Sequence, residues 1–345
     1  MRIAVVNNCV PFVSGGAEHL AEALTAKLIE HGHSALLVRI PFRWEPPGKI
    51  IESMLACRLL QLPYVDRVVG LKFPAYYIPH PNKVLWLLHQ FRQAYDLCGT
   101  PFQSLSDTDD GRRIREAVVH ADNTLLAQAR KIFTNSGVTS QRLKKFNGLD
   151  SHVLYPPLSR WEHFFCAGYG DFIFYPSRIT ASKRQHLVVE AMKYVKTAVR
   201  LVVAGQAEDP ADLERLYRII QENRLSDRVQ VIPRFITEEE KTELFSRALA
   251  CAYIPYDEDS YGYVTMESYY SRKPVITCSD SGGTDVLVKD GQTGRVVPPR
   301  PETIAIALDE LFTDRGAARR MGEAGLDLVG QLSITWDHVI GNLTA

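Results

Sequence analysis

The sequence predicts an α/β protein with two Rossmann-like domains, each built on a doubly wound parallel sheet, that face one another across a cleft. Three observations lead to this class. Strand-like apolar runs alternate with amphipathic helical stretches along most of the chain. The alternation restarts after Pro156–Pro157, a pair that ends a strand and suits a linker. The 345 residues also suit two domains at roughly 100–200 residues each.

The first alternation begins at the N-terminus. A β-branched run at 2–6 precedes a loop, and residues 17–33 then repeat apolar side chains with a helical period that ends at Gly32. This order is the opening of a doubly wound sheet. The further elements expected here are strands at 34–40, 83–89, 129–136 and 152–158 and a helix at 138–146.

The second alternation follows the proline pair. Its helix at 237–248 begins with Thr237 as N-cap and Glu240 in a capping box. Residues 316–345 are expected to be mostly helical, with bends at Gly322 and Gly325. The expected domains are 1–157 and 158–325, with a terminal helix at 326–345. The expected strands are 171–179, 199–205, 229–235, 250–256 and 274–280, and the other helices are 185–195, 211–225, 264–272 and 302–314.

Composition excludes several classes of protein. Forty Lys and Arg balance forty Asp and Glu, so the chain lacks the basic excess that nucleic-acid binding requires. Residues 1–157 hold 18 basic and 13 acidic side chains (+5) and residues 158–345 hold 22 and 27 (−5), a weak preference of the first half for anionic partners. The six cysteines are scattered, and neither a signal peptide nor an apolar stretch of about 18 residues is evident. We therefore expect a cytoplasmic protein with reduced thiols.

The stretch from Tyr256 to Ser268 carries the most chemical information. Asp259 and Glu267 stand eight positions apart, the first on a loop after a strand and the second on the following helix. Gly262 lets the backbone turn tightly into that helix, whose first-turn amides near Val264 and Thr265 would form an anion site. A carboxylate one turn later reaches vicinal ribose hydroxyls. The alternative is a surface loop before an ordinary amphipathic helix.

These residues resemble a known family. The run D-S-Y-G-Y-V-T-M-E from Asp259 to Glu267 resembles the E-x7-E signature of the group 1 (family 4) retaining glycosyltransferases. Residues 177–192 resemble the family's G-R-x-x-x-x-K-G segment, and residues 279–299 resemble its glycine-rich tail, with Asp285 at an acidic position. Residues 11–33 resemble its N-terminal glycine loop and helix. The resemblance is most specific over 174–300.

The resemblance implies a GT-B fold, with an acceptor-side first domain, a nucleotide-sugar-binding second domain and a last helix that crosses back to the first. It implies that Arg178 and Lys183 neutralise the donor diphosphate, that Glu267 holds the ribose and that Asp259 faces the sugar. The implied donor-binding set is Gly15, Gly16, Arg178, Lys183, Glu258, Tyr261, Gly262, Tyr263, Val264, Thr265, Glu267 and Arg234.

The chain departs from the family pattern at two positions. Asp259 stands where Glu is usual, so the neighbouring Glu258 is an alternative for the same role. Arg234 precedes Phe235 where a small residue is common, which bears on the pocket for the base.

The catalytic set that we expect is His89, Asp259, Arg178 and Lys183. A histidine at the carboxyl end of a parallel strand lies where such sheets place their chemistry, although it is also a common structural residue. Arg and Lys stabilise a departing diphosphate without a metal. We therefore expect no metal and no cofactor, and we regard the D-x-D patterns at Asp107–Asp109 and Asp257–Asp259 as chance matches.

The expected function is metal-independent retaining transfer of a hexosyl-type sugar from a UDP-, GDP- or ADP-linked donor to a hydroxyl of a glycan, polysaccharide or glycolipid precursor, as in lipopolysaccharide synthesis. Alternatives are another GT-B enzyme, such as a phosphorylase, sugar-nucleotide hydrolase or epimerase, and a non-catalytic nucleotide-sugar-binding subunit. The basic clusters Arg112–Arg115 and Arg142–Lys145 are interpreted as solvated helix faces. A minority interpretation makes them peripheral contacts with the inner face of a membrane that carries a lipid-linked acceptor.

Overall fold

The computed structural model describes residues 1–12 and 15–345, and these form two compact units. The first unit contains Met1–Ser159 together with Ile334–Ala345, and the second contains Arg160–Ser333. Both boundaries differ from the expected ones at 157 and 325. Residues 326–333 belong to the second unit, so the segment that joins the first unit is shorter than the expected 326–345.

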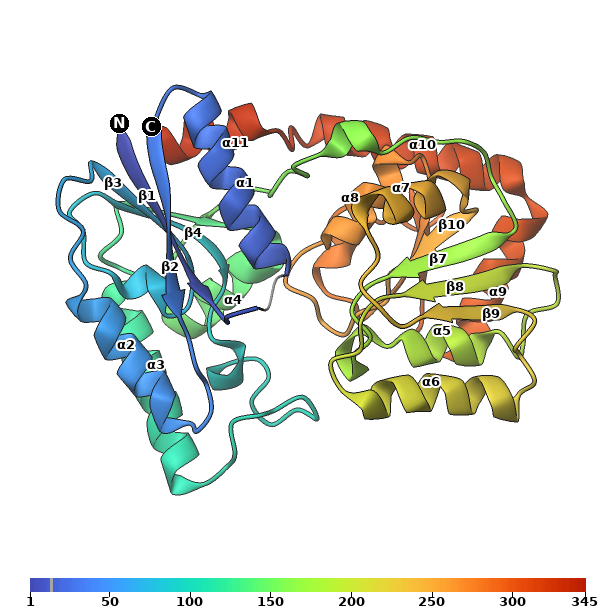
Figure 1. The fold of residues 1–345 in the computed structure, drawn as a ribbon, viewed down its shortest axis with the longest axis horizontal. Coiled ribbons are helices and arrows are strands. Elements are labelled where there is room, and N and C mark those ends of the chain that lie inside the picture. Colours follow the sequence, from blue (N-terminus) through green and yellow to red (C-terminus); the bar gives the residue numbers. More distant parts are fainter. Residues whose placement is uncertain (13–14) are drawn as a thin grey trace. The chain divides into compact units, whose positions relative to one another are not determined.

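The first unit is built on a six-stranded sheet in the order β2-β1-β3-β4-β5-β6, in which every pair is parallel. Helices cover both faces of the sheet (Figure 1), so its central strands are apolar on both sides; Ile3 to Val6 of β1 are each at most 1% exposed. The strands are β1 (Arg2–Cys9), β2 (Ser34–Pro41), β3 (Arg67–Lys72), β4 (Lys83–His89), β5 (Lys131–Thr134) and β6 (His152–Val153).

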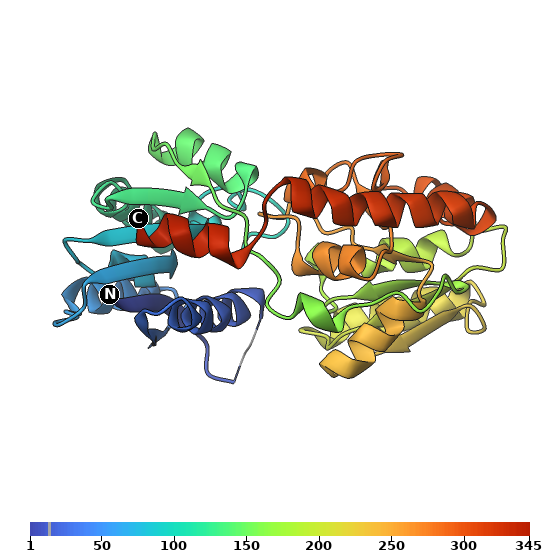
Figure 2. The ribbon, with the colours of Figure 1, turned by 90° about the horizontal axis from the view of Figure 1, so that it is seen from above.

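The helices of the first unit divide between the two faces. The helices α2 and α3 pack together on one face, and α1 lies beside α11 on the other (Figures 1 and 2). The helices are α1 (Gly16–Glu30), α2 (Gly48–Leu59), α3 (Asp109–Leu125), α4 (Gly137–Asn147) and α11 (Trp336–Thr344), with the short 3-10 helices η1 (Ala75–Tyr77) and η2 (Arg92–Ala94).

The last helix, α11, belongs to the first unit because its side chains complete that core. The indole of Trp336 packs edge-on against Trp86 of β4, with ring centroids 6.4 Å apart, and its Nε1 donates to the carbonyl of Leu158 at 3.3 Å. Arg67 of β3 donates to the carbonyl of Leu343 at 2.7 Å. These contacts join the chain's end to the first sheet.

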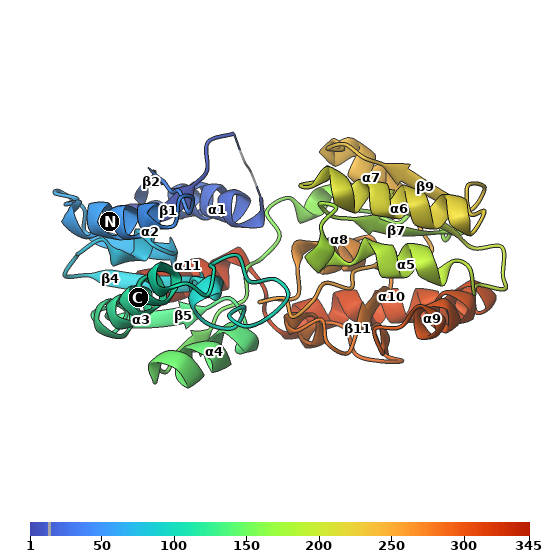
Figure 3. The same ribbon diagram turned by 90° about the horizontal axis from the view of Figure 1, so that it is seen from below.

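The second unit repeats the plan with a parallel sheet in the order β12-β11-β10-β7-β8-β9. The helices α5 and α6 lie side by side (Figure 3), and α10 packs on α8. The strands are β7 (Phe172–Pro176), β8 (Arg200–Ala204), β9 (Val229–Ile232), β10 (Ala250–Ala252), β11 (Val275–Cys278) and β12 (Gly294–Val297). The helices are η3 (Trp161–His163), η4 (Ala181–Lys183), α5 (Gln185–Ala191), α6 (Pro210–Glu222), α7 (Glu238–Arg247), α8 (Tyr263–Tyr270), η5 (Gly283–Val286), α9 (Pro301–Thr313) and α10 (Arg315–Gln331).

Gly322 and Gly325 do not interrupt α10, contrary to the expected bends, because the helix runs through both. They instead allow α10 to approach its neighbours. A Cβ at Gly322 would lie 2.0 Å from the carbonyl oxygen of Arg272, and one at Gly325 would lie 2.3 Å from the ring of Tyr269 on α8. The helix ends at Gln331, and Ser333 has a positive φ of 52° before α11 begins.

The helix α2 and the strands β3 and β12 have no counterpart among the elements expected from the sequence, and α3 was anticipated only as the helix face at Arg112–Arg115. The strand β3 is short and holds Gly70, whose place a larger residue could not fill because a Cβ there would lie 2.9 Å from the Cβ of Tyr76. In the part of the chain that the structure describes, no helix combines the length and apolar character needed to cross a membrane.

Candidate functional site

The second sheet changes winding direction between β7 and β10. From β7 the chain winds outward through β8 and β9, and β10 then pairs on the opposite side of β7. Ligands of open α/β sheets bind at the carboxyl ends of the strands beside such a point. The loop after β7 carries Arg178 and Lys183, and the loop after β10 carries Glu258 and Asp259. The topology therefore brings both predicted motifs to one edge of one sheet.

Lys183 is the centre of a polar cluster at this edge. Its Nζ donates to the phenol oxygen of Tyr253 at 3.1 Å and forms an ion pair with Glu258, while the Tyr253 hydroxyl donates to the same carboxylate at 3.2 Å. Burial raises the pKa of Tyr253 well above its usual value, and the Glu258 carboxylate raises it further. The phenol therefore remains a proton donor at neutral pH. Tyr253 is a cluster member that the sequence analysis did not identify.

Arg184, the residue after Lys183, was also not predicted, and it fixes the loops around the cluster. Its guanidinium makes two hydrogen bonds of 2.7 Å with Asp280, after β11, and donates to the carbonyls of Ile254 and Pro255 at 2.8 Å, after β10. Burial lowers the pKa of Arg184, but Asp280 outweighs this and the net shift is upward. Arg184 therefore joins three loops at the sheet edge. The sequence offered a signal for this contact: Arg184 directly follows the predicted Lys183, and Asp280 stands at the end of an expected strand.

The two other predicted cations of this unit form exposed ion pairs. Arg178 is paired with Glu208, which follows β8. Arg234 makes bonds of 2.6 and 2.8 Å with Glu240, the capping-box residue of α7. Arg178 and Lys183 thus contact different carboxylates, although they are five residues apart. Both predicted diphosphate contacts lie at the expected strand ends.

The turn into α8 has the tight geometry that the sequence predicted. Gly262 has φ of 73°, and a Cβ there would lie 2.4 Å from the ring of Tyr253. The N-cap of this helix is Gly262, which has no side chain to cap it. The Thr265 amide donates to the carbonyl of Gly262 at 3.1 Å, so it is engaged within the helix rather than offered to an anion as expected. The first-turn amides of Tyr263 and Val264 are the ones that suit the predicted anion site.

Glu267 lies on α8, where its carboxylate accepts a bond of 2.6 Å from Lys241 of α7. Burial lowers the pKa of Lys241, but Glu267 and Glu238 raise it to above its usual value, so the ammonium stays charged. Lys241 therefore orients the carboxylate that we expect to hold ribose. Sequence reasoning missed Lys241, because a Glu-x-x-Lys spacing on a helix normally indicates only a surface ion pair.

The two candidates for the first acidic position lie side by side in this loop. Glu258 forms an ion pair with Lys183, and Asp259 is only 8% exposed. The loop is held by its backbone, since the amide of Glu258 donates to Ser281 and its carbonyl accepts from Gly283, at 3.1 and 2.9 Å. The arrangement places the Glu258 carboxylate in direct contact with Lys183, one of the predicted diphosphate contacts.

The predicted site residues of the first unit lie at the carboxyl edge of its own sheet. His89 ends β4, and its Nδ1 lies 2.6 Å from the carbonyl of Gln90. Gly15 is the N-cap of α1 and Gly16 is its first residue, while Val13 and Ser14 of the same predicted loop lie outside the described residues. Gly15 has an extended φ of −154° that other residues also adopt. Backbone conformation therefore does not require glycine at position 15. The predicted role of Gly15 and Gly16 in donor binding depends instead on close approach of a ligand to the backbone.

The basic clusters of the first unit are largely neutralised. Arg112 is paired with Asp107 and Asp109, and Arg113 lies 3.7 Å from Asp110. The Nζ of Lys144 lies 2.9 Å from the Asp150 carboxylate, with which it forms an ion pair. These pairs accord with solvated helix faces at Arg112, Arg113 and Lys144, whereas Arg142 is mostly buried against Asp96 and two guanidinium nitrogens of Arg115 are buried, contrary to that interpretation. Across residues 1–12 and 15–345, no group of three or more His, Cys, Asp or Glu side chains is arranged to hold a metal.

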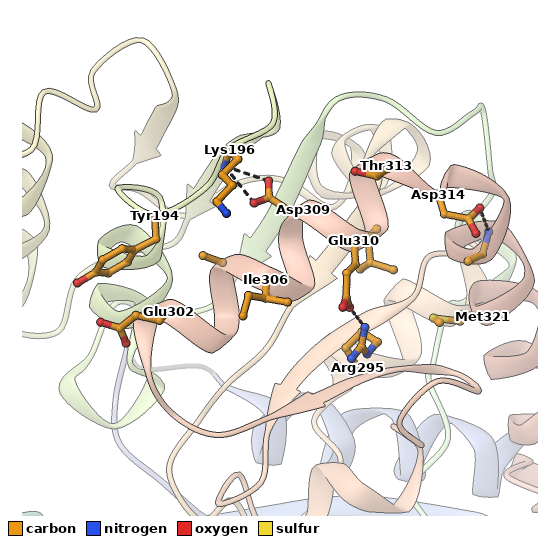
Figure 4. Close-up of a pocket in the computed structure, with 13 residues that line it drawn as sticks. Tyr194, Lys196, Arg295, Glu302, Ile306, Asp309, Glu310, Thr313, Asp314 and Met321 are labelled. Carbon is orange, nitrogen blue, oxygen red and sulfur yellow. Dashed lines mark hydrogen bonds and ion pairs between the residues drawn. The ribbon is translucent and has the colours of Figure 1, made fainter.

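A cavity of about 750 Å³ in the second unit lies apart from these residues (Figure 4). It is formed around α9, and the Arg295–Glu310 ion pair and the Lys196–Asp309 contact lie in its wall. None of the predicted site residues lines this cavity. Its walls are apolar along Ile306 and Ala305. The candidate site is therefore the carboxyl edge of the second sheet and not the cavity around α9.

Comparison with known proteins finds a family match within the second unit. Residues 168–327 match the family described as glycosyl transferases group 1. An alpha-D-kanosaminyltransferase of Streptomyces kanamyceticus is 31% identical over 49% of this chain and 44% of its own length. O-antigen chain mannosyltransferase C of Escherichia coli is 23% identical over 60% of this chain and 56% of its own length. The matched regions thus span about half the length of these relatives.

Solved structures extend the likeness to both units. Sucrose-phosphate synthase from Thermosynechococcus elongatus has a TM-score of 0.78 at 18% identity, covering 99% of this chain and 97% of that one. HepE of Anabaena, solved with UDP and glucose, has a TM-score of 0.74 at 15% identity over 100% and 99% of the two chains. The predicted resemblance and fold class are thus confirmed: the chain has the GT-B fold, and its residues 168–327 match the group 1 glycosyltransferase family.

Proposed function

We propose that the chain is a retaining glycosyltransferase that moves a hexosyl-type sugar from a nucleoside diphosphate donor to a hydroxyl group of a glycan or glycolipid precursor. The observation that carries the proposal is the cluster of Lys183, Tyr253 and Glu258 at the switch point of the second sheet. It lies within the residues that match the group 1 family. A partly buried cation supported by a phenol and bordered by a helix N-terminus suits a diphosphate.

In this proposal Lys183 and Arg178 stabilise the negative charge that develops on the diphosphate as its bond to the sugar breaks. A diphosphate competes with Glu258 for the ammonium of Lys183, and the displaced carboxylate is then available to accept a bond from a sugar hydroxyl. Glu267, oriented by Lys241, accepts the two ribose hydroxyls. Such fixed cations perform this role without a metal ion, so we propose a metal-independent reaction.

Retention follows in this proposal from front-face substitution. The departing phosphate oxygen accepts the proton of the attacking hydroxyl while the new bond forms on the same face of the sugar. No side chain then serves as nucleophile; the acidic loop of the second unit orients the sugar, and His89 is a further candidate for that role. The base remains open between uracil, guanine and adenine; the HepE structures contain UDP and UDP-glucose. We place the activity in glycan or lipopolysaccharide-type assembly by analogy with the mannosyltransferase relative.

The first test is a thermal-shift titration of the whole chain with UDP, GDP, ADP and their sugars in EDTA. Lys183→Ala is compared with wild type, and Lys193→Ala, an exposed lysine of the same unit paired with Glu190 at 3.1 Å, is the matched control. We expect one nucleotide to raise the melting temperature of wild type and the control but not of Lys183→Ala. A shift that appears only when Mg²⁺ or Mn²⁺ is added would contradict metal independence.

A second measurement addresses the reaction. The chain is incubated with the nucleotide sugar that binds, with and without a saccharide acceptor panel; products are identified by mass and their anomeric configuration by proton NMR. A glycosylated acceptor with the donor's anomeric configuration supports the proposal. Sugar released only to water or phosphate favours another GT-B enzyme. Donor binding without any turnover favours a non-catalytic subunit.

A further inference from the structure

The carboxyl edge of the first sheet carries a second pocket that the proposed donor site does not use. Its cavity is about 410 Å³, within the range of pockets for small molecules of roughly 300–1,000 Å³. It lies wholly within the first unit, between the loops that follow β2 and β4. The lining residues are Trp44, Glu45, Pro46, Pro47, Ile50, Phe91, Ser104 and Leu105.

The wall of this pocket is a rigid aromatic platform. Phe91 stacks on Phe73 with ring centroids 4.8 Å apart, and both pack edge-on against Phe42, at 6.3 and 5.6 Å. Phe42, Phe73 and Phe91 follow the carboxyl ends of β2, β3 and β4 directly or by two residues. Trp44 extends this group at 6.1 Å from Phe42 and is 45% exposed. A large apolar ring is thus held at the surface by a buried aromatic core.

The opposite wall is fixed by hydrogen bonds. The side chain of Gln93 donates to the carbonyl of Phe102 at 3.1 Å and accepts from the amide of Ser104 at 2.7 Å. This clamp sets the position of the loop that contributes Ser104 and Leu105, of which Leu105 is buried. Pockets whose walls are held in this way bind ligands with little ordering cost.

The chemistry of the lining points to one class of ligand. A sugar ring has an apolar face of C–H groups, which packs on aromatic rings, and a rim of hydroxyls, which donate to carboxylates and hydroxyl groups. Trp44 and Phe91 supply the apolar surface, and Glu45 and Ser104 supply polar groups. The negative charge of Glu45 disfavours phosphorylated ligands and favours neutral or amino sugars.

We infer that this pocket, the aromatic pocket, binds one neutral or amino sugar ring of the acceptor saccharide, next to the sugar that receives the transfer. His89 is two residues before Phe91, so the same segment carries the predicted catalytic histidine and the wall of the pocket. The inference deepens the proposed function, on which it rests, because it makes the acceptor a saccharide rather than a bare lipid or a phosphorylated polyol.

The test is saturation-transfer NMR on the full chain without nucleotide. The probes are methyl glucoside, methyl mannoside, maltose, cellobiose and glucosamine, with glucose 1-phosphate and 1-hexanol as the anionic and alkyl comparisons. We expect saturation transfer to at least one neutral or amino saccharide, strongest for the protons on one C–H face of its ring. We expect no transfer to glucose 1-phosphate or to 1-hexanol. Trp44→Ala should weaken binding about tenfold, since an aromatic contact of this kind is worth about 1 kcal/mol or more.

Trp161→Ala is the matched control, because Trp161 is 47% exposed in the second unit, where it stacks on Tyr270. It should leave the saccharide signal unchanged. Glu45→Gln, at an exposed position, is the substitute test if Trp44→Ala does not fold. It should abolish any preference for glucosamine over the neutral sugars and weaken the binding of every saccharide in the panel.

The inference is overturned if no saccharide in the panel binds, if Trp44→Ala and Trp161→Ala behave alike, or if 1-hexanol or the phosphate binds in preference. Nucleotide shifts are measured on the same sample. A nucleotide shift without a saccharide signal rejects the aromatic pocket alone. A saccharide signal without any nucleotide shift rejects the donor site and leaves the aromatic pocket standing.

Discussion

The two sheets are both parallel and doubly wound, although their strand orders are not identical, and they differ in what lines their carboxyl edges. In both, the first strand lies inside the sheet and the chain winds outward on each side of it. The edge of the second sheet carries ion pairs, among them Lys183–Glu258 and Arg184–Asp280. The edge of the first carries stacked rings, among them Phe42, Phe73 and Phe91. One plan thus presents a charged surface in one unit and an aromatic surface in the other.

This contrast shows that the location of a ligand site and the chemical class of its ligand are decided by different parts of the chain. Parallel winding brings the strand ends together in both units, and that fixes the location. The loop residues decide the chemistry, because only they reach beyond the sheet. Charged pairs suit a nucleoside diphosphate and rings suit a saccharide, so the comparison accords with a donor site in one unit and an acceptor site in the other. The predictions below alter one edge at a time.

The largest effect is expected from Gly322→Ala, which disturbs the support of the charged edge. Its methyl group would overlap the carbonyl of Arg272, 2.0 Å away, and push α10 from the segment that follows α8. We expect a loss of about 3 kcal/mol in the free energy of unfolding, with a melting temperature roughly 6–12 °C lower. Calorimetry of both transitions would show whether the first unit is affected.

Gly330→Ala is the control for this substitution, because it lies on the same helix with no atom within 4 Å of the new Cβ. It should stabilise by about 0.5–1 kcal/mol, through helix propensity alone. Equal destabilisation by both substitutions would show that the close approach of α10 is not the cause.

The next effect concerns Asp122, a buried carboxylate behind the aromatic edge. Asp122 is fully buried and accepts hydrogen bonds from Tyr76, Tyr77 and Tyr95 at 3.0, 2.7 and 2.7 Å. Burial raises its pKa to about 6, although these bonds oppose the shift. Between the unfolded value near 4 and this folded value, the folded chain holds a proton that the unfolded chain lacks, so stability falls as pH rises through this window.

We therefore expect Asp122→Asn to remove up to about 3 kcal/mol of this pH dependence between pH 4 and 7. Chemical unfolding of wild type and variant at several pH values measures it. Parallel pH profiles for the two proteins would show that Asp122 does not titrate in this window. The donor-site chemistry of the second unit should be unchanged at constant pH.

A smaller effect is expected at the charged edge itself. Glu258→Gln removes the carboxylate that competes with a diphosphate for Lys183, so affinity for the nucleoside diphosphate should rise by roughly 3–10-fold, about 1 kcal/mol. Transfer from the nucleotide sugar should fall in the same variant, because Gln cannot replace the carboxylate as a charged acceptor for the sugar. Calorimetric titration and turnover measurements check both.

Asp259→Asn is the companion variant, since Asp259 is the neighbouring carboxylate and Glu258 is the one whose ion pair with Lys183 the prediction concerns. It should leave nucleoside diphosphate affinity within about twofold. Tighter binding in Asp259→Asn but not in Glu258→Gln would reverse the assignment of the two carboxylates.

The smallest effect is expected from Arg113→Ala on the exposed face of α3. Its contact with Asp110 is 3.7 Å long and both side chains are exposed, so stability should change by less than about 0.5 kcal/mol. Sedimentation with anionic vesicles should also remain the same as for wild type. A marked loss of vesicle binding would revive the interpretation of this cluster as a membrane contact.

Much of the fold could be predicted because it depends on local patterns. The apolar runs became strands, the capping box at Thr237 and Glu240 formed as expected, and Pro156–Pro157 lies close to the boundary between units. The bends assigned to Gly322 and Gly325 were wrong, because a glycine that admits a neighbouring helix looks in sequence like one that breaks its own. The strand β3 was missed because its six residues include Gly70.

The sequence by itself determined the alternation of strands and helices and the family resemblance. It also identified Lys183, Glu258 and Glu267 as candidate donor-binding residues. These depend on spacing along the chain. Only the tertiary structure decided the partners: Tyr253 and Glu258 around Lys183, Asp280 with Arg184, Lys241 behind Glu267, and the rings that join Phe91 to Phe42. The physical reason is that these contacts join residues far apart in the chain, and pairing of strands in space, rather than any local pattern, brings them to one edge.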